Sequence, residues 1–482
     1  MGSIPTRPTT RIKTEMLLLL LLVLIAPRLE AGDWSRFRGP NGNGVQDGAR
    51  LPVELSATRN VVWKTALPPG YSSPVVSGDR IFLTGYEGDK LLTISLDRAT
   101  GKEQWRRESP RDRREKLDQR NGPASPTPVA DGKNVYVFFS DYGLLSYTFA
   151  GEERWRTPLG PFSNVYGMGG SPILAGDLVV LVCDQSRGSF AAAFRQSDGR
   201  EIWRTPRPDA VSGHSTPIVY DPPGGPRQVV APGSFRMDYY AAATGEIVSW
   251  VGGLPGEMKS GPVLVGDTIY INGFASPDND PGQQVIVPPF AEMLAKHDAD
   301  KDGKISPAEA PDERTRKYFV FIDLDEDGAA DAAEWRTWSN GSASENGLLA
   351  FRAGGRGDQT GKGLLWRYSR SVPQLPTTLV YRGTLYMIND GGILTTFDAA
   401  SGAVKNQARL RGAVDHYYAS PVAGDGKVYI VSQTGVVVVL DADRDQAVLS
   451  TGQMEDEVYA TPAIADRRIF IRTRGALYCF GS

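Results

Sequence analysis

A repeated unit runs along almost the whole chain and limits the folds that the chain can adopt. Each unit begins with a small polar residue, a proline and apolar residues, continues through short apolar runs separated by Gly/Asp turns, and ends in a run that carries a tryptophan. Short strands of this kind, repeated at this period, are typical of the blades of a β-propeller. The repeat prolines are Pro74, Pro128, Pro172, Pro217, Pro262, Pro376, Pro421 and Pro462. The sequence therefore predicts an all-β fold, an eight-bladed β-propeller.

The last unit lacks its tryptophan run, and a run near the start of the chain has the missing pattern. This early run spans residues 60–65 and contains Trp63. We predict that it forms the outer strand of the last blade, because this arrangement closes the ring without free edges. The tryptophan strands of the other blades are expected at Trp105, Trp155, Trp203, Trp250 and Trp366.

Residues 96–105 (LDRATGKEQW) resemble the tryptophan-docking motif of the eight-bladed propellers of the pyrroloquinoline-quinone (PQQ) type. Residues 194–203 and 241–250 resemble it more weakly, and residues 33–41 (DWSRFRGPN) resemble the opening segment of the family's exported bacterial members. The resemblance covers residues 33–482 and implies the fold. The family includes quinoprotein dehydrogenases and propellers without a cofactor, among them the scaffold lipoprotein of outer-membrane assembly, so the fold does not decide the function.

The interval between Pro262 and Pro376 is far longer than the others and contains two acidic stretches, 298–309 and 323–334. Both fit the calcium-loop pattern D-x-[DN]-x-[DN]-G-x5-E, which arranges six to eight oxygen ligands about one point. The expected ligands of the first loop are Asp298, Asp300, Asp302, the Lys304 carbonyl, Ser306 through a water, and Glu309. Those of the second are Asp323, Asp325, Asp327, the Ala329 carbonyl, Asp331 and Glu334. The sequence predicts a calcium-binding EF-hand pair, and the alternative is a pair of solvated acidic turns.

The predicted EF-hand pair departs from the usual pattern at two positions. Ala330 stands where a branched apolar residue is usual, which predicts poor pairing with Ile305, and Pro311 interrupts the expected exit helix of the first loop. We expect a structural calcium site of weak affinity, about 10⁻⁴–10⁻³ M, and not a sensor. The apolar residues of its helices, expected to pack on each other, are Phe290, Met293, Leu294, Tyr318, Phe319, Phe321 and Ile322.

Basic residues precede an apolar run at residues 16–26 that has the length of a signal-peptide core and is short for a membrane span. Cleavage after Ala31 predicts a periplasmic or secreted protein with no membrane span after cleavage, and the alternative is an uncleaved signal anchor. The expected organisation is a signal peptide at 1–31, propeller segments at 32–273 and 346–482, and the EF-hand pair at 285–340.

Charge and cysteine content exclude two classes of protein. The sequence has no basic patch of the kind that binds nucleic acid, so we do not expect nucleic acid as a partner. Cys183 and Cys479 are too few for a disulfide scaffold, and both lie in apolar runs, so buried thiols are expected. The sequence does not decide whether these two cysteines form a disulfide with each other.

In a propeller blade, the connection after the second strand and the connection to the next blade lie on the same face. The EF-hand insertion in blade five is therefore expected to cap the channel mouth, beside connections that carry Tyr166 and Tyr459. A PQQ-dependent dehydrogenase would need a base, a stacking platform and a cation there. The candidates are His214, Asp415 and His416, with Tyr417 and Tyr418 as platforms.

The enzyme interpretation lacks two features that the resemblance implies. The family's adjacent-cysteine disulfide is absent, and no ligand motif supports PQQ. For His214, and for Asp415 with His416 as an acid–base pair, hydrogen bonding at the channel rim is the favoured alternative. We therefore predict a non-catalytic binding or scaffold protein with calcium as its ion and a protein or polymer partner on the propeller face. A PQQ-dependent dehydrogenase is the alternative.

Overall fold

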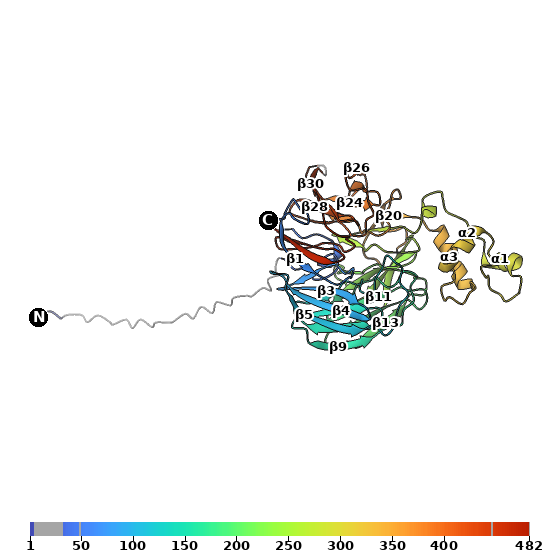
Figure 1. Ribbon diagram of the computed structural model, residues 1–482, viewed down its shortest axis with the longest axis horizontal. Helices are drawn as coiled ribbons and strands as arrows, with labels where there is room; N and C mark the ends of the chain where they lie inside the picture. The colour runs from blue at the N-terminus through green and yellow to red at the C-terminus, as the bar shows by residue number, and fades with distance from the viewer. Residues whose placement is uncertain (4–31, 48–49, 445–446, 482) are drawn as a thin grey trace.

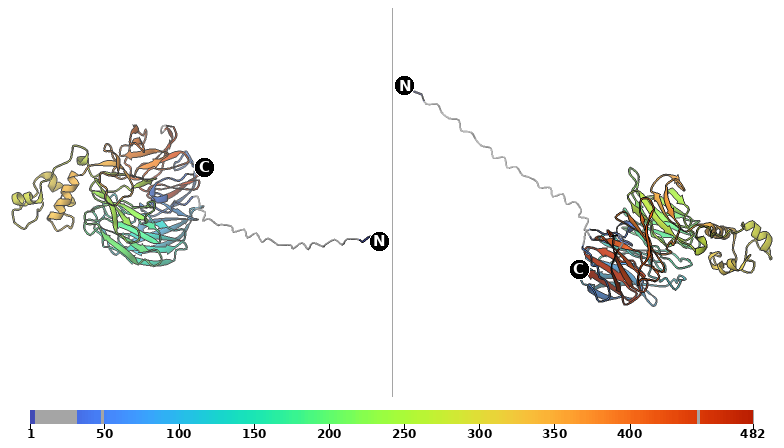
Figure 2. Two further views of the ribbon diagram at one scale, coloured as in Figure 1. Left: turned by 180° about the vertical axis from the view of Figure 1, so that it is seen from behind. Right: turned by 90° about the horizontal axis from the view of Figure 1, so that it is seen from above.

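The computed structural model describes residues 1–3, 32–47, 50–444 and 447–481. Eight small sheets are arranged in a ring, and a group of helices projects from one side of it (Figures 1 and 2). The predicted eight-bladed propeller is confirmed. The predicted signal peptide, residues 1–31, falls almost entirely outside the described residues.

Each blade is an antiparallel sheet whose strands follow one another from the channel outward, and we number the blades in chain order. Blades one to four are β2 (Val75–Ser77), β3 (Arg80–Glu87), β4 (Lys90–Asp97), β5 (Glu103–Pro110); β6 (Val129–Ala130), β7 (Asn134–Phe139), β8 (Gly143–Thr148), β9 (Glu153–Pro158); β10 (Ile173–Ala175), β11 (Leu178–Cys183), β12 (Phe190–Arg195), β13 (Glu201–Pro206); and β14 (Ile218–Tyr220), β15 (Gln228–Pro232), β16 (Arg236–Ala241), β17 (Ile247–Gly252). Blades five to eight are β18 (Val263–Val265), β19 (Thr268–Gly273), β20 (Gly347–Arg352), β22 (Leu364–Tyr368); β23 (Leu379–Tyr381), β24 (Thr384–Asn389), β25 (Ile393–Asp398), β26 (Val404–Arg409); β27 (Val422–Gly424), β28 (Lys427–Val431), β29 (Val436–Asp441), β30 (Val448–Gln453); and β31 (Ala463–Ala465), β32 (Arg468–Arg472), β33 (Ala476–Gly481), β1 (Val61–Ala66). A short strand, β21 (Gly357–Asp358), joins blade four in parallel beside β17.

The first strand closes the ring, as predicted. β1 pairs antiparallel with β33, with Trp63 opposite Cys479 and Lys64 opposite Tyr478. Cys479 and Cys183 are buried free thiols in different blades, so the bridge left open by the sequence is not formed.

The tryptophans dock against the following blade. The indole Nε1 of Trp155 donates to the carbonyl of Gln196 at 2.9 Å, and its ring covers Gly199, where a Cβ would overlap it. Trp63, Trp105, Trp203 and Trp366 make the same contacts with the next blade. Trp250 differs, because the guanidinium of Arg236 lies 5.5 Å from its ring centre.

The small polar residue at the start of a repeat has a structural role, because its side-chain hydroxyl bonds to the backbone of the preceding blade. The hydroxyl of Thr127 accepts a hydrogen bond from the Ser73 backbone N–H at 2.9 Å, and Ser171 does the same for Thr127 at 3.0 Å. Thr216 accepts from Ser171 in the same way, and a second series starts at Gly261, whose N–H donates to Thr377, and continues to Ser420 and Thr461. The hydroxyls link neighbouring blades at the channel wall and satisfy its buried N–H groups.

The segment before β1 closes the end of the channel away from the helical insertion. Trp34 bridges Val76 of blade one, and Val45 bridges Ala423 of blade seven. Between them, a turn of 3₁₀ helix, η1 (Pro40–Gly42), follows Arg38, which is 1% exposed and donates to the carbonyls of Thr378 and Pro421 at 2.9 and 3.2 Å. The segment therefore ties distant blades together across the ring.

The helical insertion separates β19 from β20 in blade five. It consists of η2 (Pro277–Asn279), α1 (Phe290–His297), α2 (Glu313–Lys317), η3 (Phe319–Phe321) and α3 (Ala332–Ala343). Its own core is small, and the buried side chains are Met293, Ile305, Phe319, Ile322, Ala330 and Trp335. Of the predicted apolar stripes, Met293, Phe319 and Ile322 pack together with Phe290 and Leu294 against them, whereas Phe321 faces Tyr166 of the propeller. Among the described residues, no helix is both long and apolar enough to cross a membrane.

Two local expectations for the insertion have different outcomes. The weak pairing predicted at Ala330 is wrong: Ile305 N–H donates to the Ala330 carbonyl at 3.0 Å, and Ala330 N–H donates back at 2.7 Å. This pairing uses backbone atoms and does not depend on a branched side chain. As expected at Pro311, the first loop leaves through turns, and α2 begins only after Asp312 caps it.

Candidate functional site

A cavity of about 230 Å³ lies at the mouth of the channel. All eight connections between an outer strand and the next inner strand contribute to its wall. Representatives from these connections are Tyr71, Asn121, Tyr166, His214, Lys259, Gln374, Tyr418 and Tyr459. Phe37 of the N-terminal segment also lines the cavity. The channel mouth is therefore an open pocket and is not plugged by side chains.

Tyrosines form much of the wall. The ring centres of Tyr71 and Tyr459 are 4.7 Å apart, and those of Tyr418 and Tyr459 are 4.8 Å apart. Tyr166 meets His214 edge to face at 5.9 Å. Such a wall can bind a planar or apolar group while the phenol oxygens stay near water.

The charged groups of the cavity are paired within the protein. Arg120 donates to both carboxylate oxygens of Asp118 at 2.7 and 3.0 Å, and Lys259 pairs with Glu257 at 2.5 Å. Both cations also lie over the ring of Tyr166, at 5.6 and 5.3 Å from its centre. The mouth therefore carries fixed dipoles and balanced charge.

His214 is the unpartnered polar group of the wall. Its Nε2 is buried and has no hydrogen-bond partner within the described part of the chain. Burial, and then the charge of Lys259, lower the pKa of His214 to about 3. The imidazole is therefore neutral at physiological pH. The rim hydrogen bond favoured from the sequence is absent at this nitrogen.

The structure places three of the sequence candidates, Asp415, His416 and Tyr417, outside the cavity lining. His416 pairs with Asp390 at 2.9 Å instead of with its neighbour Asp415, whose carboxylate accepts from Thr434. Hydrogen bonding to Asp390 raises the pKa of His416. Tyr417 is buried and donates to the Ala413 carbonyl at 2.6 Å. Of the five enzyme candidates, only His214 and Tyr418 line the cavity.

A second cavity of about 200 Å³ lies between the propeller and the helical insertion. Tyr166 lines this cavity too, together with Phe235 of blade four and Phe321, Tyr318 and Trp338 of the insertion. One side chain thus forms a wall common to both cavities.

The two acidic loops predicted from the sequence lie side by side in the insertion. The carboxylates of Asp298, Asp300 and Asp302 have oxygen atoms within 4.8 Å of one another, and Asp323, Asp325 and Asp327 form an equal group. The closing Glu309 accepts from the N–H and hydroxyl of Ser306 at 2.9 and 2.8 Å. Asp331 and Glu334 form a capping box at the start of α3. Oxygen-rich groups of this kind could hold a hard cation such as calcium.

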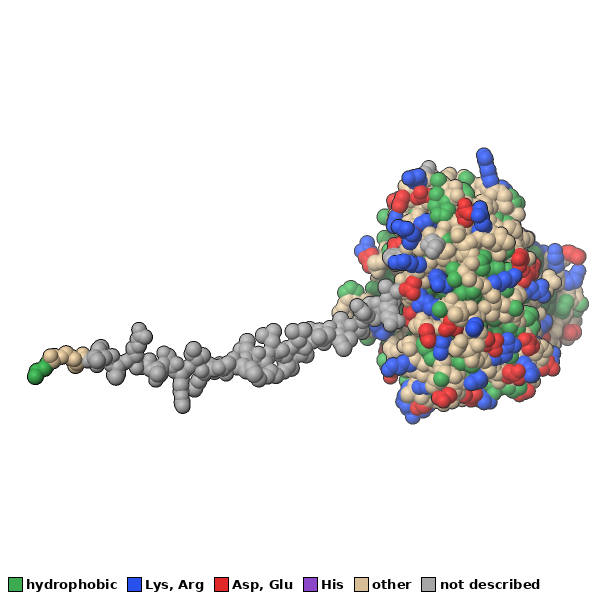
Figure 3. Space-filling view, turned by 60° about the vertical axis from the view of Figure 1, so that its left-hand side comes forward, with side chains coloured by type: hydrophobic (Ala, Val, Ile, Leu, Met, Phe, Trp, Pro, Cys, Tyr) green, Lys and Arg blue, Asp and Glu red, His purple; other side chains and the backbone are tan. Residues whose placement is uncertain are grey.

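Sequence reasoning missed Arg120, Lys259, Tyr71 and Phe37 as cavity residues. The repeat placed the connections on the mouth face, but it carried no information about which side chains turn inward. The face in Figure 3 has acidic and basic side chains interspersed, in agreement with the absence of a basic patch in the sequence.

The comparisons with known proteins agree on the fold. The family described as outer membrane protein assembly factor BamB matches residues 45–192, 93–274 and 187–482. No curated protein matches the chain in sequence. The structure is similar to that of BamB from Moraxella catarrhalis, at 13% identity and a TM-score of 0.53 over 87% of this chain and 98% of the other.

Two solved enzymes share the architecture. A europium-containing methanol dehydrogenase has 8% identity and a TM-score of 0.61 over 94% of this chain and 99% of the other. A quinohemoprotein alcohol dehydrogenase from Pseudomonas putida HK5 has 12% identity and a TM-score of 0.56 over 94% and 80%. At these identities the likeness concerns the fold alone. With its family match extending from residue 45 to residue 482, the chain belongs to the family of the outer membrane protein assembly factor BamB.

Proposed function

We propose that the protein is an exported, non-catalytic binding propeller that presents its channel-mouth face to a protein partner. In this proposal residues 1–31 form the signal peptide, residues 32–273 and 346–482 form the propeller, and residues 285–340 form an EF-hand pair. The protein would act in the periplasm or after secretion. The match to an assembly-factor family supports a protein partner.

The state of the charged groups in the mouth cavity is the main support for a non-catalytic role. Arg120 and Lys259 are already paired with Asp118 and Glu257. A histidine with a pKa near 3, as for His214, is too weak a base to take a proton efficiently near neutral pH. The cavity is better suited to holding an aromatic or apolar side chain of a partner than to proton transfer.

Calcium binding by the insertion has its own support. Gly303 and Gly328 adopt φ of 82° and 96°, the left-handed backbone that the sharp turn of such a loop requires. Oδ1 of Asp298 is buried with no partner among the described residues, as expected of an oxygen awaiting a cation. The proposed ligands are Asp298, Asp300, Asp302, Lys304, Ser306, Glu309, Asp323, Asp325, Asp327, Ala329, Asp331 and Glu334.

A PQQ-dependent dehydrogenase is the second candidate. The tyrosine walls and the cations beside Tyr166 suit a planar anionic ring. The donor set does not fit the whole requirement, because Asp118, the acidic side chain that lines the cavity, is held by Arg120. No set of free carboxylates at the described mouth is in place to hold a cation beside the ring. We therefore derive no reaction there.

Two experiments test the proposal. A photo-crosslinking amino acid replaces Tyr418 at the mouth, and in a control it replaces the exposed Val265 at the opposite end of blade five. We expect a discrete protein adduct in exporting cells from position 418 alone, whereas equal labelling from both positions, or none, contradicts it. The purified protein is also incubated with PQQ and calcium, and dye reduction is followed with alcohols and sugars. Turnover or a bound quinone spectrum would overturn the non-catalytic role.

Calcium binding is tested by thermal unfolding of the full chain in calcium and in chelator. At a concentration ten times the Kd, one site contributes about 1.4 kcal/mol to the free energy of unfolding. We expect a higher midpoint in calcium and none of this gain in a variant with both Glu309→Gln and Glu334→Gln. An identical midpoint in calcium and chelator counts against a calcium site.

A further inference from the structure

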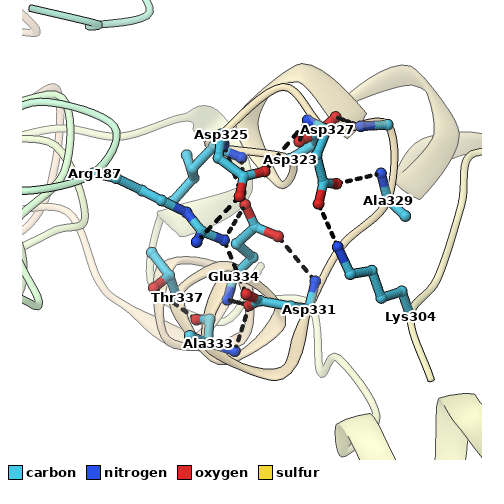
Figure 4. Close-up of polar contacts among 12 residues, drawn as sticks. Arg187, Lys304, Asp323, Asp325, Asp327, Ala329, Asp331, Ala333, Glu334 and Thr337 are labelled. Carbon is cyan, nitrogen blue, oxygen red and sulfur yellow. Dashed lines mark hydrogen bonds and ion pairs between the residues drawn. The ribbon is translucent and has the colours of Figure 1, made fainter. Parts of the chain in front are cut away.

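An arginine of the propeller reaches into the second acidic loop of the insertion (Figure 4). Arg187 lies between β11 and β12 of blade three, far from the insertion in sequence. Its Nη1 is 3.1 Å from Oδ2 of Asp325, and its Nη2 is 2.9 Å from both Oδ2 of Asp331 and Oε1 of Glu334. One guanidinium thus joins three carboxylates that belong to another part of the molecule.

The Glu334 carboxylate is the least accessible of the three. Its side chain is 2% exposed, against 45% for Arg187. Oε1 also accepts from the Leu324 N–H at 2.8 Å, and Oε2 accepts from the Asp331 N–H at 2.9 Å. A buried carboxylate needs compensating charge, and the guanidinium supplies it from outside the loop.

The three carboxylates occupy the third, ninth and twelfth positions of the second loop, and the third and twelfth supply direct ligands in a calcium loop. The guanidinium is therefore a stand-in cation at the place where a calcium ion would be bound. A calcium ion and the guanidinium repel each other at such distances, so both cannot hold these oxygens at once.

The first loop differs in this respect. Within the described part of the chain, Glu309 accepts from backbone and hydroxyl groups of its own loop, including the Ala299 N–H at 2.8 Å. Asp298 keeps an unpartnered buried oxygen within the described chain. Lys304 of the first loop even turns to the second loop, where it pairs with Asp327. The two loops are alike in sequence, but both cationic side chains, Arg187 and Lys304, lie on the carboxylates of the second loop.

We propose that Arg187 is a built-in competitor of calcium at the second loop, and that it fastens the insertion to the propeller when calcium is absent. Calcium binding at the second loop displaces Arg187 and loosens this fastening, whereas the first loop binds calcium without that cost. The proposal rests on the calcium function proposed above. Linkage is reciprocal, so Arg187 weakens calcium binding at the second loop by the same factor by which calcium weakens the Arg187 contact.

The insertion has other contacts with the propeller, and at its base Glu345 accepts from Ser369 at 3.1 Å and from Arg367 at 3.0 Å. Lys116 pairs with Glu326 at 2.9 Å, with both side chains largely exposed. Tyr166 contacts Phe321 at a ring separation of 6.1 Å. An exposed pair of this kind contributes little, so the three-carboxylate contact of Arg187 is the main polar fastening.

The test is calcium titration by calorimetry of the full chain, after removal of bound metal. The variant Arg187→Gln removes the charge while keeping hydrogen-bonding capacity. The variant Arg411→Gln makes the same charge change at an exposed arginine that follows β26. We expect two sites in the unaltered protein, with the weaker one tightened about tenfold in Arg187→Gln. Arg411→Gln should leave both sites unchanged.

A second readout follows the fastening directly. Hydrogen exchange in the segment between β11 and β12 should rise when calcium is added to the unaltered protein, and it should be insensitive to calcium in Arg187→Gln. If the calcium affinities of the two sites are the same in Arg187→Gln as in the unaltered protein, or if the second site is weaker in Arg187→Gln, Arg187 does not compete with calcium. The proposed calcium function would then still stand. If neither protein binds calcium, the calcium function and this inference both fail.

Discussion

The ring of Tyr166 lies 6.1 Å from the ring of Phe321, so a side chain of the channel mouth also supports the helical insertion. Tyr166 lines both cavities, whereas Tyr418 lines only the mouth cavity. The seat of the insertion and the wall of the mouth are thus parts of one surface.

Tyr166→Ala should loosen the insertion more than Tyr418→Ala. Loss of an aromatic pair costs about 0.5–1.5 kcal/mol beyond the buried area. We expect faster limited proteolysis within residues 285–340 in Tyr166→Ala and the unaltered rate in Tyr418→Ala. Equal proteolysis rates in the two variants would show that the ring contact does not hold the insertion.

Gly199→Ala should destabilise the propeller because Trp155 needs a glycine beneath it. Gly199 has a φ of 72°, and a Cβ there would overlap the indole. Overpacking of this kind costs about 1–3 kcal/mol, in addition to the cost of the left-handed backbone. Gly176→Ala is the matched control, since Gly176 has a φ of 68° but open space around its Cβ position. Thermal midpoints should fall clearly further for Gly199→Ala, and equal falls would contradict the docking argument.

Arg38→Met should lower stability even though it places an apolar side chain in a buried site. The guanidinium donates to carbonyls of blades six and seven, and to Gly42 at 3.0 Å, and the variant leaves these acceptors without donors. Each buried unsatisfied group costs about 1–3 kcal/mol. We expect a large drop in the denaturant midpoint, whereas Arg411→Met at an exposed arginine should have little effect. A midpoint unchanged in Arg38→Met would mean that the segment does not stabilise the ring.

Glu115 gives the stability a pH dependence. Burial raises the pKa of Glu115 from 4.5 to about 7, against hydrogen bonds from the Met168 N–H to both its oxygens. Between these pH values the folded state binds more protons than the unfolded state. The contribution of Glu115 to the free energy of unfolding therefore falls as pH rises from 4.5 to 7, and above pH 7 it no longer changes. The loss at pH 8 should be on the order of 1–3 kcal/mol.

Glu115→Gln checks this assignment. The amide cannot ionise, so the variant should lose less stability than the unaltered protein between pH 5 and pH 8. Chemical denaturation at the two pH values measures the difference. Parallel losses in both proteins would assign the pH dependence to other groups.

The fold could be predicted because its determinants are local and repeated. Each Ser/Thr-Pro start, each turn and each docked tryptophan recurs, so eight copies of one signal reinforce each other, and Trp63 identified the closing strand. The mouth cavity depends on side-chain directions in non-repeated connections. Asp415 and His416 are neighbours in sequence, yet His416 pairs with Asp390, which lies in the turn between β24 and β25 of blade six. The contact of Arg187 with Glu334 likewise joins two segments that are far apart in sequence, and neither segment has a motif that predicts the contact.

The pairing of β1 with β33 determines when the propeller ring can close during folding. β1 precedes the other strands of the propeller in sequence and β33 follows them, so this closing pair forms only after the residues of all eight blades have been synthesised. Contacts between distant parts of a chain form slowly and leave strand edges uncovered meanwhile. Until β1 and β33 meet, the ring is open and both of these strands have an uncovered edge.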